Sequence, residues 1–160
     1  MLRKQIRKDF PDDLGVRLAQ KDIAALATVL VTSEAPGHPI DHAFDDSRGP
    51  GGSRWVAEAP GQQRLALVFD TPQTLRTLTL EVEELETQRT QELAVAISRD
   101  GGHTYQELLR QEYNFSPPGT TFEREVWTLG AEGVTHLQLT IKPDKGSNLC
   151  HATLTSLILQ

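Results

Sequence analysis

The stretch RLALVFDTPQTLRTLTLEVE, residues 64–83, decides the fold class of this chain. Apolar residues occupy every second position in its two halves, 64–70 and 75–83, as expected for two strands with one buried face. Thr71-Pro72 between them predicts a proline-led turn, because proline has no N–H for a strand ladder. The same alternation places Glu81 and Glu83 on a solvent-facing side.

The rest of the chain repeats this pattern of short strands and turn residues. Asp100-Gly101-Gly102 and Ser116-Pro117-Pro118-Gly119 are strong turn signals, and no long helical pattern separates the strands. We therefore predict an all-β fold, an antiparallel β-sandwich or barrel. The predicted strands are 27–33, 64–70, 75–83, 92–100, 104–114, 122–129, 134–141 and 152–159. The residues predicted to point between the sheets are Leu65, Leu67, Phe69, Leu78, Leu80, Val95, Ile97, Leu137, Leu139 and Leu157.

Length, charge and cysteine content exclude several classes of protein. A chain of 160 residues fits one domain, here 27–160, preceded by a short N-terminal extension, 1–26, with a basic arm at 2–8. A net charge of −6 argues against a nucleic-acid-binding surface. The apolar run at 23–31 is too short to span a bilayer, so we expect no membrane insertion. The single Cys150 forms no internal disulfide, and we expect a cytoplasmic protein.

The chain carries, in order, Ala43-Phe44-Asp45-Asp46, Arg54-Trp55, Leu65 to Phe69, Thr71-Pro72, ELAVAISRDGGHTY, VTHLQLTI and ATLTSLIL. This series resembles the discoidin domain, also called the coagulation factor 5/8 type C domain, a relative of the family 32 carbohydrate-binding modules. The resemblance covers about residues 27–159 and rests on the order and spacing of its segments. It implies a jelly-roll sandwich, galactose-binding-domain-like, with ligand loops at one end. A further segment, NFSPPGTT, resembles one found in bacterial single-domain relatives.

The loop HPIDHAFDDSRGPGGSRW, residues 38–55, is the candidate metal site. Relatives hold calcium at the equivalent loop, and here Asp45 and Asp46 would be its ligands. Two departures weaken that site, since Asp46 replaces a turn glycine and Ser156 replaces a closing glutamate. A zinc site of His38, Asp41 and His42 lacks suitable spacing. We therefore expect no metal and no cofactor, with Ile40, Phe44 and Trp55 packing inward instead.

The sequence gives no reason to expect an enzyme. It has no nucleophile elbow, no metalloprotease motif and no phosphate loop. Cys150 and His151 are neighbours that would point to opposite faces of a strand, so we interpret Cys150 as a buried structural thiol.

Two functions from different classes remain open. The first is a non-catalytic carbohydrate-binding module that uses the loops at one end, and the second is an intracellular protein-interaction scaffold with the same fold. The residue types that sugar-binding relatives place in such loops predict a site, although Arg89 pairing with a glutamate and ring packing in the core are alternatives. The predicted ligand-binding residues are His42, Arg54, Arg89, Tyr113, Asn114 and Phe115.

Overall fold

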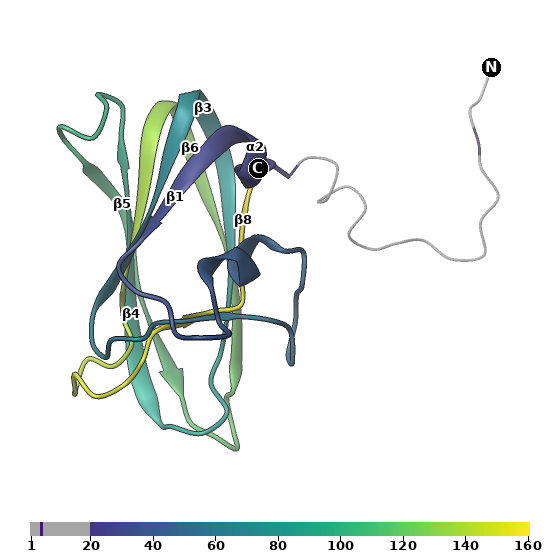
Figure 1. Cartoon of the computed structure of the whole chain (residues 1–160), viewed down its shortest axis with the longest axis vertical. Helices are drawn as coiled ribbons and strands as arrows, with labels where there is room; N and C mark the ends of the chain where they lie inside the picture. The colour runs from purple at the N-terminus through teal and green to yellow at the C-terminus, as the bar shows by residue number, and fades with distance from the viewer. Residues whose placement is uncertain (1–3, 5–19) are drawn as a thin grey trace.

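Two strands of 21 residues, β3 (Gln63–Glu83) and β6 (Phe122–Lys142), organise the molecule. They appear in a computed structural model that describes Lys4 and residues 20–160 (Figure 1). The other elements are α2 (Ile23–Leu26), β1 (Ala27–Val31), the 3-10 helix η1 (Ile40–Phe44), β2 (Trp55–Val56), β4 (Arg89–Ser98), β5 (Gln106–Phe115), β7 (Thr153–Leu154) and β8 (Ser156–Leu159).

The predicted turn at Thr71-Pro72 is wrong, because β3 bends there without reversing. Both halves of β3 pair with the same partner, β6, and the register shifts three times between Val68 and Thr77. Pro72 interrupts the ladder, and Gly130 and Gly133 of β6, both with positive φ, let the partner bend at the same level. The two predicted strands 122–129 and 134–141 are likewise one bent strand.

The bend places the halves of β3 and β6 in two layers. The large sheet contains β1, the first half of β3, the second half of β6, β4 and β5, in that order. The small sheet contains the first half of β6, the second half of β3 and β8. All pairings are antiparallel, and β2 and β7 form a separate short pair. The molecule is thus an antiparallel jelly-roll β-sandwich.

The core lies between the two sheets, where the alternation pattern placed it. The ten residues predicted to point inward are all buried, with at most 7% of any of them exposed. Trp55 and Ile40 are buried as well, and Phe44 packs against the same cluster. Because sequence register fixes which side chains face inward, this agreement confirms the predicted register of the strands.

The predicted exposure of Glu81 and Glu83 is wrong, since each is only 4% exposed. They do face away from the core, but the segment 45–54 crosses the outer face of the small sheet and covers them. The Gly49 N–H donates to Glu81 Oε2 at 3.0 Å, and the Gly51 N–H donates to Glu83 Oε2 at 2.7 Å. The two carboxylates therefore hold this covering segment, 45–54, in place.

The packed structure begins before residue 27. Ile23 of α2 is buried in the core, and the Lys21 N–H donates to the Leu159 carbonyl at 2.7 Å. The predicted boundary at residue 27 therefore marks the start of β1 and not the start of packing. The basic arm at 2–8, apart from Lys4, lies outside the described residues. In the described part, none of the helices has the length and apolar character to cross a membrane.

Candidate ligand-binding site at the loop end of the sandwich

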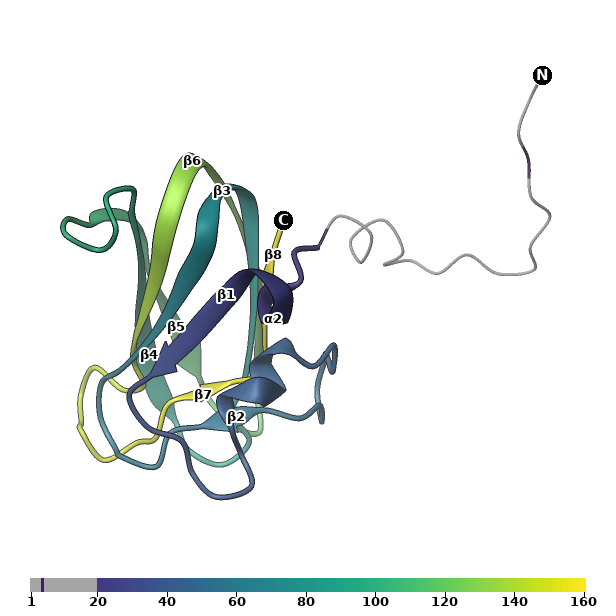
Figure 2. The same cartoon turned by 45° about the horizontal axis from the view of Figure 1, so that its top comes forward.

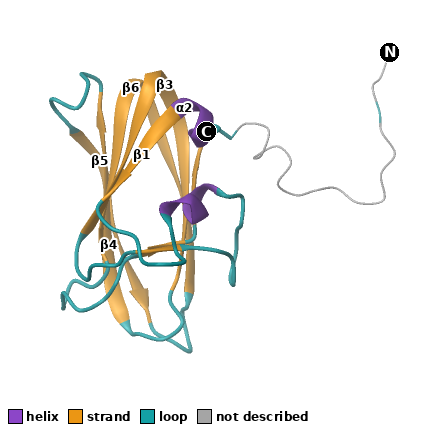
Figure 3. Ribbon diagram, in the orientation of Figure 1, coloured by secondary structure: helices purple, strands orange, loops and turns teal. Residues whose placement is uncertain are grey.

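Four connecting segments meet at the end of the sandwich where β3 stops and β4 starts. They are 57–62, 84–88, 116–121 and 143–152, and they form the lower end of the molecule in Figure 3. The Glu84 N–H donates to the Thr121 carbonyl at 2.7 Å, and the Gly61 N–H donates to the Cys150 carbonyl at 2.9 Å. We call this group of segments the loop end.

A buried arginine joins the loop end together. Arg89 Nε donates to Glu84 Oε1 at 2.8 Å, and Nη1 donates to the Pro143 carbonyl at 2.7 Å and to Gln91 Oε1 at 2.9 Å. Its guanidinium also lies over the Phe115 ring, 4.8 Å from the centroid. Arg89 thus links segment 84–88 to segment 143–152.

This arrangement sets the charge states of two neighbouring groups. Partial burial acts to raise the pKa of Glu84, but the hydrogen bond and charge of Arg89 outweigh it, and the pKa is lowered. Burial, together with the Asp144 carboxylate, raises the pKa of the Cys150 thiol. Glu84 is therefore ionised at neutral pH and Cys150 is a protonated, half-buried thiol, which is unsuited to nucleophilic attack.

Four of the six predicted ligand-binding residues come together on the β4–β5 pair. Arg89 is opposite Phe115 in the strand register, and Thr90 Oγ1 donates to Asn114 Oδ1 at 2.7 Å. Tyr113 and Phe115 are only 5% and 1% exposed, so their rings fill the core and present no face to a ligand. The geometry of Arg89, Tyr113 and Phe115 agrees with the packing alternative, whereas Asn114 is exposed.

The other two predicted residues form a separate pair. The His42 ring lies with Nδ1 at 3.2 Å from the Arg54 carbonyl oxygen, next to the covering segment. Both residues are half-buried. Across residues 20–160, no hydrogen bond or ion pair connects either of them to Arg89 or to the ends of β4 and β5.

Two exposed leucines at the loop end were missed by the sequence analysis. Leu85 is 56% exposed and Leu149 is 83% exposed. The segments that carry them are tied together through Arg89, as described above. Leu85 interrupts the acidic run EVEELE, and Leu149 lies in the polar segment GSNLCH. A single leucine within a polar loop was the only feature of the sequence that could have indicated their exposure. The same segments carry the polar side chains of Glu84, Asp144 and Asn148.

The residues that would hold calcium do not fit a cation. Asp45 Oδ1 accepts the Ser47 N–H at 3.0 Å, and Asp45 Oδ2 accepts the Ser53 hydroxyl. The covering segment turns N–H groups, not carbonyl oxygens, toward Glu81, the strand neighbour of Ser156. Calcium needs six to eight oxygens, and Lys4 and residues 20–160 contain no group of three or more metal-ligating side chains.

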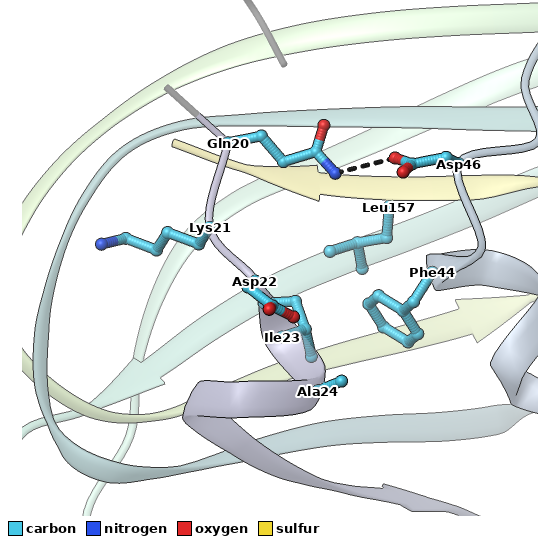
Figure 4. A pocket seen from close by; sticks show the side chains of 8 residues that line it. All are labelled: Gln20, Lys21, Asp22, Ile23, Ala24, Phe44, Asp46 and Leu157. Atoms are coloured by element: carbon cyan, nitrogen blue, oxygen red, sulfur yellow. Dashed lines mark hydrogen bonds between the residues drawn. The ribbon is translucent and has the colours of Figure 1, made fainter. Parts of the chain in front are cut away.

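A separate hollow of about 320 Å³ lies between α2 and η1, away from the loop end (Figure 4). Ile23, Phe44 and Leu157 form its apolar side. At its mouth the Gln20 amide donates to Asp46 Oδ1 at 3.1 Å (Figure 4). This bond, together with the bond that Arg48 Nη2 donates to Gln20 Oε1, links the segment before α2 to the covering segment.

Comparison with known proteins identifies the fold. No family model and no curated protein matches the sequence. Among solved structures, CBM32-3 from a family 31 glycoside hydrolase of Clostridium perfringens has a TM-score of 0.64 at 14% identity, over 88% of this chain and 93% of that chain. The chain has the fold of the family 32 carbohydrate-binding modules. The predicted resemblance is therefore confirmed at the level of the fold.

Further modules with this fold bind different sugars. The family 32 module of C. perfringens NanJ in complex with galactose has a TM-score of 0.61 at 11% identity, over 88% of this chain and 96% of that chain. A chitosan-binding module from the chitosanase/glucanase of Paenibacillus sp. IK-5 has a TM-score of 0.57 at 16% identity, over 88% of this chain and 98% of that chain. At these identities the shared feature is the architecture.

Proposed function

We propose that this protein is a non-catalytic carbohydrate-binding module whose ligand surface is the loop end. The supporting observation is that sandwiches of the same architecture, matched over most of both chains, are carbohydrate-binding modules. The fold alone does not assign a ligand. The kind of ligand is therefore inferred from the side chains of the loop end.

The loop end supplies both kinds of contact that a sugar uses. The exposed side chains of Leu85 and Leu149 would pack on the apolar face of a sugar ring. The Glu84 carboxylate, oriented by Arg89, and the Asn148 amide would bond to hydroxyls. Arg89 would act as a positioning residue. Asn114, at the end of β5, stays a predicted contact of this surface, whereas His42 and Arg54 lie apart from it and stay a separate prediction.

A protein-interaction scaffold is the second candidate, because one observation favours it. The exposed large apolar side chains of the loop end are leucines, and the only aromatic residue in that exposed class among residues 20–160 is Tyr105, which follows the turn at the opposite end. Leucine gives a sugar less specific stacking than an aromatic ring, and suits a protein partner equally well.

A glycan array probed with the purified full chain separates these candidates. We expect selective binding of glycans, lost in Leu149→Asp and unchanged in Val126→Asp. Val126 is the matched control, since it is exposed on β6, outside the four segments of the loop end. Unchanged melting temperatures show that the fold is intact. Failure to bind any glycan, or equal loss in both variants, contradicts the proposal, and the first of these results favours the scaffold.

A further inference from the structure

The outer face of the large sheet carries a trough that runs across its strands. The register aligns Arg64, Thr140, Ala94 and Arg110 in one row across β3, β6, β4 and β5. The next row contains Leu30, Ala66, Gln138, Ala96 and Glu107. Alanines at the centre of both rows leave the middle of this face low, and longer side chains stand at its ends.

Two adjoining hollows follow these rows and meet at Gln138. One, of about 320 Å³, lies over β4, β5 and β6, and the other, of about 240 Å³, lies over β1, β3 and β6. Both helical segments lie on the β8 side of the molecule, away from this face (Figure 2). The two hollows together form one groove, which we call the sheet groove.

The charges of the sheet groove are unevenly compensated. Arg110 is paired with Glu92 and Glu107, and Glu92 is also 3.4 Å from Lys145 Nζ. Arg64 and Lys142 also line the groove, and no carboxylate among the described residues pairs with either of them. The lining thus contains three cations and two carboxylates, both carboxylates already paired, although the whole chain has a net charge of −6.

The floor and one wall offer contacts to a polar, uncharged backbone. Gln138 and Thr140 present an amide and a hydroxyl from the floor. Tyr105 is 42% exposed at one wall, and the His136 ring meets it edge-on with centroids 6.5 Å apart. An exposed, supported aromatic ring is a suitable surface for the face of a sugar.

The geometry points to the sheet groove as a binding site for a linear oligosaccharide that carries carboxylate groups, that is, one containing uronic acids. Arg64 and Arg110 stand three strand spacings apart, about 14 Å, so a chain of several sugars can reach from one to the other. Arg64 and Lys142 are free to bind carboxylates, and the planar guanidinium suits two oxygens at once.

A peptide fits this groove less well. The groove crosses the middle of the sheet, where the strand N–H and C=O groups are already paired, so an extended peptide cannot add as a further strand there. The sheet groove borders the loop end at Gln62. Its assignment rests on residues of the strands, Arg64, Gln138 and Lys142, and does not depend on the proposed function of the loop end.

The test is calorimetric titration of the full chain with the tetramer of α-1,4-linked galacturonic acid. Arg64→Gln and Lys142→Gln should each weaken binding by about tenfold, and added salt should weaken it further. Ala94→Trp should abolish binding by filling the floor. Arg124→Gln is the matched control, since it removes an exposed cation from the small sheet and should leave binding unchanged.

Four results would overturn the assignment. They are no binding of the tetramer, equal binding of neutral maltotetraose, equal binding of a tetraglutamate peptide, and unchanged affinity in both Arg64→Gln and Lys142→Gln. These two charge variants keep the test decisive if Ala94→Trp is unstable. Leu149→Asp should leave tetramer binding unchanged, so failure of the sheet groove and failure of the loop end give different results.

Discussion

The outer faces of the two sheets show the same alternation in sequence but have different surroundings. On the small sheet, Glu81 and Glu83 lie beneath the covering segment, 45–54, and bond to its backbone N–H groups. On the large sheet, Glu92 lies in an open groove and pairs with Arg110 and Lys145. Alternation therefore identifies the side of a strand that faces away from the core, but not whether that side meets water.

A substitution in the core between the two sheets should have the largest effect on stability. Leu80, the inward neighbour of Glu81, is buried, and Leu80→Ala should cost about 2–5 kcal/mol in the free energy of unfolding, because it removes packing and leaves a cavity. Urea denaturation measures this loss. The exposed Val126 is the control, and Val126→Ala should cost about 0.5 kcal/mol or less. Similar losses in both would place Leu80 on the wrong face.

The covered and open faces should differ in how much their carboxylates stabilise the fold. Glu81→Ala should cost about 1–3 kcal/mol, because it removes the buried side chain that accepts the Gly49 N–H. Glu92→Ala should cost about 1 kcal/mol or less, since its ion pairs are solvent-screened. The same denaturation experiment compares them. Equal, small losses would mean that the covering segment does not depend on Glu81.

Acid should weaken the loop end through Glu84. Its pKa is lower in the folded protein than in the unfolded chain, so its contribution is fully present above the unfolded pKa of about 4.3. The contribution is lost as pH falls through the folded pKa. The Glu84→Gln variant should therefore lose less stability than the wild type between about pH 5 and pH 3. Thermal melting of both proteins over this pH range measures the difference. Parallel acid curves for the two proteins would contradict this role.

Calcium should have the smallest effect on stability. The Gly49 and Gly51 N–H groups of the covering segment, and not carbonyl oxygens, face the Glu81 and Glu83 carboxylates, and we therefore expect no calcium to bind in this loop. We expect melting temperatures in EDTA and in millimolar calcium to agree within about 1 °C, since a ligand that does not bind the native state cannot stabilise it. A rise of several degrees in calcium would make Asp45 and Asp46 its ligands.

The sequence predicted the inward register of the strands because that signal is local. Leu65, Leu67 and Phe69 alternate within one segment, and no distant residue changes which side they share. The bend in β3 was less predictable, since Pro72 favours a turn locally. The strand continues through it because β6, some 60 positions later, bends with it at Gly130 and Gly133.

The candidate site was less predictable for the same reason. Arg89, Tyr113 and Phe115 were chosen for residue type at strand ends, but all three are buried. Arg89 is held there in part by the Pro143 carbonyl, which is distant from it in sequence. Leu149 had no periodic pattern around it. Exposure of a single loop residue is set by tertiary contacts, and residue types alone do not reveal it.

The most direct test of the account is an amide NMR titration of the full chain with the glycan that the array selects, because it locates the ligand. Binding at the loop end predicts chemical-shift changes within 84–88 and 143–152, including Leu85 and Leu149, and none at Gly49 or Gly51 of the covering segment. Changes confined to the covering segment, or no changes within 84–88 and 143–152 at a saturating concentration of that glycan, would contradict the proposed site.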